Sequence, residues 1–350
     1  MTDPVRWGVL ATGKIAHTFV ADLALVPGAE LVAVGSRSLE SARAFVAEHP
    51  DATSTTTGTG TATAYGSYEE LVADPAVEVV YVATPHALHL ENARMAFEAG
   101  KHVLCEKPLT LSAAAAEEMV ALARRHDRFL MEAMWTACHP VVRQLAEDLH
   151  AGRFGTPRQL QAELGFRVDA PPEDRLMNPD LGGGALLDMG IYPLTFAHLM
   201  LGEAESLRAI ATLAPSGIDL DVVIAGAYPG GALATMNASM SSWSSRAAAI
   251  ATDEGRIVIS DQFHHPDRAV FLPYGSGTND TAAPGAEVVV TGREPVLGRG
   301  YGNEIAEVDR CVRAGLRESP LVPHEQTLTI LRQLDDLRRQ VGVVYAGDPA

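Results

Sequence analysis

Two stretches of the sequence combine residue types that can move a proton. In LCEKPLT, residues 104–110, a charged pair stands at the end of an apolar run and is followed by proline. An ammonium such as that of Lys107, placed near a substrate hydroxyl, stabilises a developing alkoxide. In GGGALLDMGIYPL, residues 182–194, Asp188 and Tyr192 are four residues apart and would share one face of a helix. The alternatives are a solvated lysine, a helix-capping aspartate and a tyrosine buried in the core.

A third stretch has the pattern of a turn that binds a dinucleotide. Ala11–Ala16 follows an apolar run, Val5–Leu10, and matches G-x-G-x-x-[GA] except that Ala11 replaces the first glycine. At such a turn the backbone N–H groups and the helix N-terminus face a pyrophosphate, and Gly13 stands where the backbone approaches it. The alternative is an ordinary strand-to-helix turn. The residues predicted to contact the cofactor here are Gly8, Thr12, Gly13, Lys14 and Ile15.

The end of the next predicted strand, Leu31–Val34, indicates which dinucleotide would bind. NAD-binding chains usually carry Asp or Glu there, which accepts hydrogen bonds from the ribose hydroxyls. This chain has Ser36, 36 − 13 = 23 residues beyond Gly13, followed by Arg37. A serine and an arginine suit a 2′-phosphate through charge-assisted hydrogen bonds. The sequence therefore favours NADP(H) over NAD(H), with an exposed arginine at a helix start as the alternative.

The elements that would carry these residues alternate in the first third of the chain. Strand-like runs such as Glu78–Ala83 and Phe129–Met131 alternate with helical patterns such as Leu88–Ala99 and Ser112–Arg125. This alternation predicts an α/β fold, a Rossmann-type doubly wound parallel sheet. Such folds bind ligands at the carboxyl edge of the sheet. The polar and proline residues that follow Glu78–Ala83 at this edge are Thr84, Pro85, His86 and His89.

After about residue 155 the pattern changes. Strand-like runs then follow one another through short turns, which predicts a mainly antiparallel sheet in an α+β domain. These runs are 158–168, 206–214, 219–228, 231–240, 246–252 and 255–260. We predict a dinucleotide-binding domain at 1–133 and a substrate-binding and oligomerisation domain at 134–350, whose C-terminal helix, 323–342, is free to pack back on the first domain. The Thr/Gly/Ala-rich run Ala52–Ala64 is interpreted as a surface insertion.

Composition indicates which partners the protein can have and in which compartment it functions. The chain has 350 residues and a net charge of 27 − 44 = −17. An acidic protein of this kind repels nucleic acid and anionic membranes, so neither is expected as a partner. Three cysteines without metal-type spacing, and an N-terminus without the apolar core of a signal peptide, favour a cytoplasmic protein.

His264-His265 lacks a third ligand at a sensible spacing, so we expect no metal site and interpret the pair as a surface turn.

In order and spacing, three blocks of the sequence resemble the Gfo/Idh/MocA oxidoreductases: GVLATGKIA at 8–16, ATPHALHLENARMAFEAGKHVLCEKPLTL at 83–111 and GGGALLDMGIYPL at 182–194. That family pairs a Rossmann domain with an open-faced β-sheet domain. Within it, LMEAMW at 130–135 and SPLVP at 319–323 look most like the branch of dimeric dihydrodiol dehydrogenase and D-xylose dehydrogenase (NADP). Where that branch has W-x-R-F-x-P, this chain has WTACHP. If Ala137, Cys138 and His139 reach the substrate pocket, the specificity differs from that of the branch.

The resemblance implies roles for the residues singled out above. Lys107 would sit at the nicotinamide, and Tyr192 would take or give the proton of the substrate hydroxyl while the lysine stabilises its phenolate. Asp188 would orient the substrate or Lys107. Glu106 would help to fix the lysine-bearing loop, and His89 would be a helix residue that packs near the cofactor and not a catalyst. The residues implied around the cofactor on these two loops are Thr84, Pro85, His86, His89, Glu106 and Lys107.

The resulting prediction is an NADP(H)-dependent oxidoreductase that moves a hydride between nicotinamide and a CH–OH or C=O carbon of a sugar, polyol or diol. Two alternatives are a reductase of keto-sugars attached to a nucleotide, and a non-catalytic binding protein that senses the dinucleotide. Because an open-faced sheet leaves a large surface to cover, we also expect a homodimer or a higher homo-oligomer formed through the C-terminal sheet.

Overall fold

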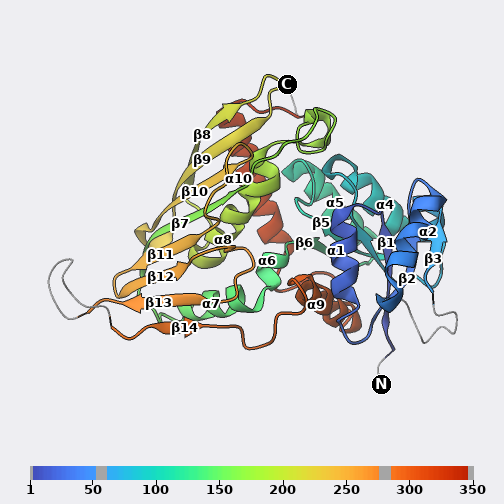
Figure 1. Cartoon of the computed structure of the whole chain (residues 1–350), viewed down its shortest axis with the longest axis horizontal. Helices are drawn as coiled ribbons and strands as arrows, with labels where there is room; N and C mark the ends of the chain where they lie inside the picture. Colours follow the sequence, from blue (N-terminus) through green and yellow to red (C-terminus); the bar gives the residue numbers. More distant parts are fainter. Residues whose placement is uncertain (1–2, 53–60, 276–284, 346–350) are drawn as a thin grey trace. The chain divides into compact units, whose positions relative to one another are not determined.

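The computed structural model describes residues 3–52, 61–275 and 285–345, and the chain divides into two compact units (Figure 1). The first unit comprises residues 1–138 and 296–328, and the second comprises 139–295 and 329–350. The first unit therefore includes residues 296–328, which the sequence analysis assigned to the second domain. Most of the predicted insertion Ala52–Ala64 lies outside the described residues, but its end belongs to a strand, Thr63–Tyr65.

A six-stranded parallel sheet forms the centre of the first unit. Its strand order is β3-β2-β1-β4-β5-β6, the arrangement of a dinucleotide-binding fold, which confirms the predicted doubly wound sheet. The strands are β1 Val5–Leu10, β2 Ala29–Gly35, β3 Thr63–Tyr65, β4 Val79–Val82, β5 His102–Glu106 and β6 Leu130–Ala133. The helices are α1 Lys14–Leu23, α2 Leu39–Glu48, α3 Tyr68–Ala73, α4 His89–Glu98, α5 Ala113–Arg125, α6 Trp135–Cys138 and α9 Tyr301–Arg313.

The helix α9 is far in sequence from the other helices of the first unit, but hydrogen bonds join it to α1. The carboxylate of Asp22, near the end of α1, accepts three backbone hydrogen bonds at the start of α9. They come from the N–H groups of Arg299 at 2.8 Å, Tyr301 at 3.0 Å and Gly302 at 3.3 Å. The first N–H groups of a helix have no partner inside the helix, so Asp22 acts as a cap supplied from another element.

An eight-stranded, mainly antiparallel sheet forms the centre of the second unit. Its order is β14-β13-β12-β11-β7-β10-β9-β8, and β7 and β10 are its parallel neighbours. The strands are β7 Pro157–Gly165, β8 Ser206–Leu213, β9 Asp219–Ala227, β10 Leu233–Ser239, β11 Ala248–Thr252, β12 Gly255–Ile259, β13 Ala269–Pro273 and β14 Val288–Val290. The helix α7, Pro140–His150, packs on α8, Ile191–Leu201, which packs on β7 and β10. A third helix, α10, spans His324–Val341 and continues from the first unit into the second.

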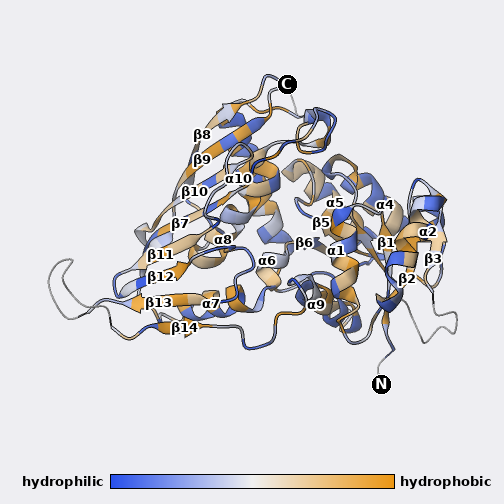
Figure 2. Ribbon diagram, viewed as in Figure 1, coloured by the Kyte–Doolittle hydropathy of each residue, from blue (hydrophilic) through white to orange (hydrophobic). Residues whose placement is uncertain are grey.

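The two faces of this sheet differ in what they meet. In Figure 1, α7 and α8 lie along one face. Strands β8 to β10 carry hydrophobic residues interspersed with hydrophilic ones (Figure 2), and alternate residues of β9 and β10 are exposed. This alternation is that of a sheet with one packed and one open face, so the predicted fold class is confirmed. The short strands β13 and β14, however, were not predicted.

One apolar stretch lies in the core of the second unit. Pro179–Leu201 has the length and the mean hydropathy, 1.3, of a membrane-crossing helix. Of that stretch's most apolar window, 83% is buried inside the structure, as in the core helix of a soluble protein. The stretch carries Asp188 and Tyr192, so its packing positions two of the predicted catalytic residues.

Candidate active site

The turn between β1 and α1 has the shape that a phosphate requires. Ala11 adopts a positive φ of 86°, a conformation that favours glycine and that explains the glycine usual at this place. Gly13 is the N-cap of α1, and among the described residues no heavy atom beyond its chain neighbours lies within 4 Å of where its Cβ would be. The first turn of α1 carries Lys14 and no acidic residue. Backbone N–H groups, space and positive charge thus fit a pyrophosphate.

The residues predicted to select NADP(H) follow β2. Ser36 is buried, and its backbone N–H donates to the carbonyl oxygen of Tyr65 at 3.2 Å. Arg37 is exposed and directly precedes Ser38, whose hydroxyl caps α2 by accepting from the N–H of Ser41 at 3.3 Å. An arginine placed at the edge of the sheet is available to a 2′-phosphate, and it also matches the alternative of an exposed arginine at a helix start.

The loop after β4 is tied to the loop that carries Lys107. The buried ring of His89 has its Nε2 2.9 Å from the carbonyl oxygen of Thr84. Its Nδ1 lies 3.1 Å from the carbonyl oxygen of Pro108 and 3.2 Å from that of Leu109. The hydroxyl of Thr84 in turn accepts from the Asn92 amide at 3.0 Å. His89 therefore lies between the two loops and contacts both, a role that the sequence reasoning did not give it.

Glu106 fixes the backbone at Lys107. One of its carboxylate oxygens accepts from the buried hydroxyl of Tyr81, and the other accepts from the backbone N–H of Lys107 at 3.2 Å. Burial, and then the charge of Glu106, raises the pKa of the Tyr81 hydroxyl well above 10, so that this group stays a donor. The Lys107–Pro108 peptide bond is cis. The loop is thus anchored to β4 through Tyr81.

Glu132 is a further anchor of this loop that the sequence reasoning missed. It lies in β6, and one of its oxygens accepts from the backbone N–H of Leu109 at 2.9 Å. The other accepts from the hydroxyl of Thr327 in α10 at 2.9 Å. Burial raises the pKa of Glu132, while these two hydrogen bonds and the charge of Lys107 oppose that rise. A carboxylate in an otherwise apolar strand, LMEA, was the signal available in the sequence.

The three glycines at 182–184 occupy backbone positions in the second unit that disfavour a side chain, either through their φ angles or through close packing. Gly182 and Gly184 have positive φ angles of 80° and 130°. A Cβ on Gly183 would lie 2.7 Å from the carbonyl oxygen of Leu176, and one on Gly184 would overlap the carboxylate of Asp219. Asp219 is fully buried and accepts from the backbone N–H of Leu186 at 2.5 Å. In the block GGGALLD, the positions of Gly183 and Gly184 thus leave no room for a side chain.

Asp188 and Tyr192 follow these glycines, but not on a regular α-helix as predicted. Leu186–Gly190 is a π-helical turn, and α8 begins only at Ile191. Such turns occur frequently at functional sites. Asp188 is nearly buried and accepts from Nη1 of Arg175 at 3.0 Å, an ion pair that the sequence reasoning did not anticipate. Tyr192 is 8% exposed.

The histidine pair that was interpreted as a surface turn packs beside Tyr192. Residues 263–265 do form a turn, yet both histidines are only partly exposed. The ring of His264 lies 5.0 Å from that of Tyr192 and 4.4 Å from that of His265, measured between ring centroids. The interpretation as a surface turn therefore missed the contact of His264 with Tyr192. Within residues 3–52, 61–275 and 285–345, no three His, Cys, Asp or Glu side chains are grouped to hold a metal ion.

The structure thus gathers the predicted residues into two sets. Lys107 and the residues that anchor its loop belong to the first unit, whereas Asp188 and Tyr192 belong to the second. Each set is built from elements of its own unit. The catalytic pairing of Lys107 with Tyr192 stays a prediction.

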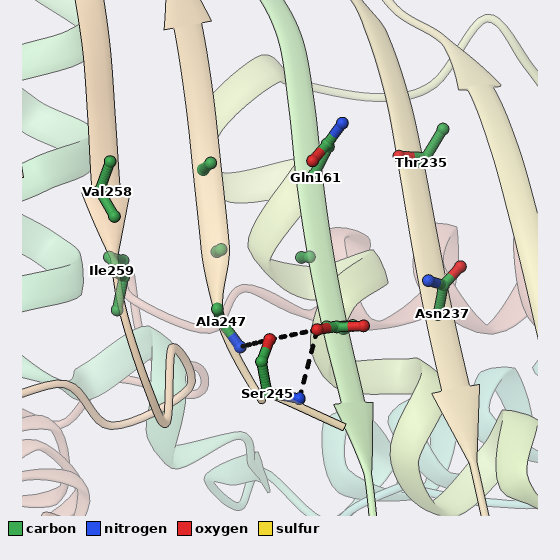
Figure 3. Close-up of a pocket in the computed structure, with 11 residues that line it drawn as sticks. Gln161, Thr235, Asn237, Ser245, Ala247, Val258 and Ile259 are labelled. Carbon is green, nitrogen blue, oxygen red and sulfur yellow. Dashed lines mark hydrogen bonds between the residues drawn. The ribbon is translucent and has the colours of Figure 1, made fainter. Parts of the chain in front are cut away.

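A hollow on the open face of the second sheet is separate from these residues. It crosses the strands β7, β10, β11 and β12, and Figure 3 shows that both polar and apolar residues line it. The carboxylate of Glu163 accepts from the Ser245 hydroxyl and, at 3.3 Å, from the backbone N–H of Ser245. The lining residues that Figure 3 labels are Gln161, Thr235, Asn237, Ser245, Ala247, Val258 and Ile259.

Relatives of known name match the whole chain. The chain is 34% identical over 348 residues to trans-1,2-dihydrobenzene-1,2-diol dehydrogenase of Sus scrofa, covering 98% of this chain and 99% of the relative. It is 35% identical over 374 residues to D-xylose 1-dehydrogenase (NADP(+)) of Hypocrea jecorina, covering 97% and 93%. These two enzymes represent the branch that the motifs predicted.

Solved structures show the same fold. The 3-ketoreductase KijD10 of Actinomadura kijaniata, in complex with NADP and TDP-benzene, superposes with a TM-score of 0.81 at 27% identity, covering 98% of this chain and all of that one. That enzyme has also been solved with a single tyrosine or a single lysine replaced. The aldose-aldose oxidoreductase of Caulobacter crescentus has a TM-score of 0.82 at 22% identity, covering 97% and 98%.

Two family models account for most of the sequence. Residues 5–134 match the oxidoreductase family with an NAD-binding Rossmann fold, and residues 142–258 match the Gfo/Idh/MocA C-terminal domain. Both halves therefore agree with the order of motifs, with the two sheets and with the named relatives. The chain belongs to the Gfo/Idh/MocA family of oxidoreductases.

Proposed function

We propose that the chain is an NADP(H)-dependent oxidoreductase that acts on a CH–OH or C=O carbon of a sugar, polyol or related diol. The observation that carries the proposal is the loop bearing Lys107 at the carboxyl end of β5. Buried side chains of Glu106, His89 and Glu132 tie this loop to β4, to the loop after β4 and to β6. A lysine on a backbone fixed in this way is preorganised to stabilise charge on a reacting oxygen.

The phosphate turn and Arg37 support NADP(H) as the cofactor. The N–H groups at the start of α1 would hold the pyrophosphate, and Ser36 and Arg37 would bind a 2′-phosphate. The name of the xylose dehydrogenase relative includes NADP(+), and the ketoreductase was solved with NADP. When bound, the nicotinamide accepts or donates the hydride, and the protein orients the partners.

Three residues divide the remaining chemistry. The hydroxyl of Tyr192 takes the proton of the substrate hydroxyl in oxidation and returns it in reduction. The ammonium of Lys107 stabilises the alkoxide of the substrate and the phenolate of the tyrosine. Asp188, held by its ion pair with Arg175, orients the substrate beside Tyr192. A tyrosine and a lysine were also the residues replaced in the solved variants of the ketoreductase relative.

The roles are tested by replacing the hydroxyl alone. Tyr192→Phe should lower kcat by about 10²–10⁴-fold, the usual size of a general acid/base contribution, while NADPH affinity stays nearly unchanged. Tyr274→Phe is the matched control, because Tyr274 is 67% exposed in the same unit. If Tyr192→Phe instead abolishes NADPH binding, Tyr192 belongs to the cofactor site and the assignment fails.

A second candidate function is a reductase of keto-sugars attached to a nucleotide. The observation that favours it is the ketoreductase relative, which was solved with TDP-benzene as well as NADP. Turnover of NADPH with a nucleotide-linked keto-sugar, and none with free sugars or diols, would select this candidate. A non-catalytic sensor would bind NADPH tightly and turn over neither kind of substrate.

The open face of the second sheet supports a homo-oligomer. Ile210 on β8 and Val223 on β9 are paired in register and are 81% and 54% exposed. Leu233, at the start of β10, is 56% exposed. We propose that a second copy covers this face in a homodimer or a higher homo-oligomer. Light scattering should show that Ile210→Asp shifts the protein toward the monomer, and an unchanged mass would reject this interface.

The state of the cysteines supports the cytoplasm as the location. Among the described residues, Cys105, Cys138 and Cys311 are all buried and none forms a disulfide. Thiols persist in this state in a reducing compartment.

A further inference from the structure

The turn between β12 and β13 places histidines next to the proposed acid/base residue. His264 packs on Tyr192 with 5.0 Å between ring centroids and an angle of 55° between the rings. His265 packs edge-on against His264, at 4.4 Å and 87°. All three residues belong to the second unit.

Two ring contacts with α8 hold the turn between β12 and β13 in place. Tyr192 and Phe196 are four residues apart and lie on one face of α8. The ring of Tyr192 contacts that of His264, and the ring of Phe196 contacts that of Phe263 with 5.3 Å between centroids and 70° between the ring planes. Neighbouring residues of the loop thus contact positions of α8 that are one helical turn apart. The buried Phe263 also donates its backbone N–H to the carbonyl oxygen of Arg246 at 3.0 Å. His264 is therefore a fixed neighbour of Tyr192.

A third histidine interacts electrostatically with His265 of this turn. His139, part of the WTACHP run that departs from the related branch, is buried. Burial, with the charge of His265 as a second cause, lowers the pKa of His139 to about 4. Burial also lowers the pKa of His265 itself, and the facing Arg246 acts in the same direction, against the carboxylates of Asp261 and Asp267. At neutral pH His139 is thus a neutral imidazole, with one donor and one acceptor nitrogen.

A substrate hydroxyl has the matching pair of functions, since it both donates and accepts. The ion pair of Arg175 with Asp188 adds further polar groups four residues before Tyr192. An unsaturated ring diol offers only its two hydroxyls, one of which reacts, and an apolar ring beyond them. A sugar or polyol offers hydroxyls on every neighbouring carbon, so polar groups at several places around Tyr192 can each find a partner.

We propose that His264 is a specificity-determining residue, which hydrogen-bonds a hydroxyl next to the reacting carbon and thereby selects polyhydroxylated sugars or polyols over diols of an apolar ring. This inference rests on the proposed function, because it takes Tyr192 as the group that marks the reacting carbon. It assigns to this chain one of the two substrate kinds that the names of its relatives contain.

The test separates the hydrogen bond of His264 from the packing of its ring. His264→Phe keeps a ring against Tyr192 and removes both nitrogens, whereas His264→Gln keeps a donor and an acceptor without the ring. His150→Phe is the matched control, because His150 is exposed at the end of α7 in the same unit. Each protein is assayed with NADP⁺ and either D-xylose or trans-1,2-dihydrobenzene-1,2-diol, and sugar binding is measured by calorimetry in the presence of NADP⁺.

We expect His264→Phe to lower kcat/KM for xylose by about tenfold, the size of one hydrogen bond, mainly through KM. His264→Gln should retain most of the activity, and the diol should be a poor substrate of every variant. Equal losses in the Phe and Gln variants, or a wild-type protein that prefers the diol, would overturn the inference. If the wild-type protein turns over neither substrate, the proposed function fails, and calorimetry still decides whether His264 binds the sugar.

Discussion

The two sets of proposed catalytic residues are held in different ways. Around Lys107, buried side chains from α4 and β6 hydrogen-bond the backbone of one short loop, and Tyr81 of β4 donates to the carboxylate of Glu106. Around Tyr192, the backbone itself is the constraint, through Gly183 packed against Leu176, Gly184 packed against Asp219, and a π-helical turn. Hydrogen bonds of buried polar side chains fix the first set, and close backbone packing at glycines fixes the second.

The difference indicates how each set tolerates change. A loop held by several hydrogen bonds loses them one at a time, so that single replacements weaken it by degrees. Where the backbone leaves no room for a Cβ, even the smallest replacement has a large effect on stability, because any side chain must displace its neighbours. We therefore expect the largest single effects on stability at the glycines of the second unit.

The sharpest way to break this comparison is Gly184→Ala. Gly184 has a φ of 130°, and its Cβ would overlap the carboxylate of Asp219, so the variant should lose about 4 kcal/mol of unfolding free energy. Gly217→Ala is the matched control, since Gly217 has a φ of 90° and no described atom within 4 Å of its Cβ position beyond its chain neighbours. Urea unfolding measures both. A loss no larger than that of Gly217→Ala would show that the packing at Gly184 is not the constraint.

The corresponding change in the first unit is Glu132→Leu. It leaves the backbone N–H of Leu109 and the hydroxyl of Thr327 without their acceptor, which should cost about 3 kcal/mol. Glu132→Gln keeps one acceptor oxygen and should cost about half as much. Because the loop carries Lys107, kcat should fall in the order wild type, Gln, Leu. Stable variants with full activity would show that Glu132 does not position the lysine.

The pH dependence of the unfolding free energy tests the burial of Asp219 in the second unit. Burial raises the pKa of Asp219 to about 6 from its ordinary 3.8, so the folded state binds this proton more tightly than the unfolded chain does. The stability from this group is fully present below pH 3.8 and is lost as the pH rises through 6. Between pH 5 and 7.5 the loss should be about 1.4 kcal/mol. Asp219→Asn should lack this part of the pH dependence, and an identical profile in both proteins would refute it.

The smallest expected effect is a gain at the phosphate turn. Ala11 has a φ of 86°, a conformation that costs an L-residue about 1 kcal/mol more than glycine. Ala11→Gly should therefore raise the unfolding free energy by up to about 1 kcal/mol while NADPH binding is kept. A destabilised Ala11→Gly variant would show that the alanine methyl group contributes packing that outweighs the strain.

Local patterns in the sequence were sufficient for much of this account. The phosphate turn and the Lys107 loop each occupy one short stretch of sequence. The alternation of strands and helices is also a pattern of neighbouring residues, so residue types and spacing predicted all three. The contacts that were missed join distant residues: Glu132 with Thr327, Arg175 with Asp188, and Tyr192 with His264. Spacing carries no information about such pairs, because the fold alone brings them together. His264-His265 looked like a surface turn for the same reason.

The central claim is that Lys107 serves an NADP(H)-dependent oxidation or reduction, and one assay tests it most directly. Absorbance of the reduced nicotinamide would be followed with NADP⁺ and D-xylose, D-glucose, inositols or a trans-dihydrodiol, for the wild-type protein and Lys107→Ala. We predict turnover of at least one sugar or polyol by the wild-type protein and its loss in Lys107→Ala, with the fold intact by circular dichroism. Equal turnover by both proteins, or NADPH binding without turnover of any substrate, would contradict the account.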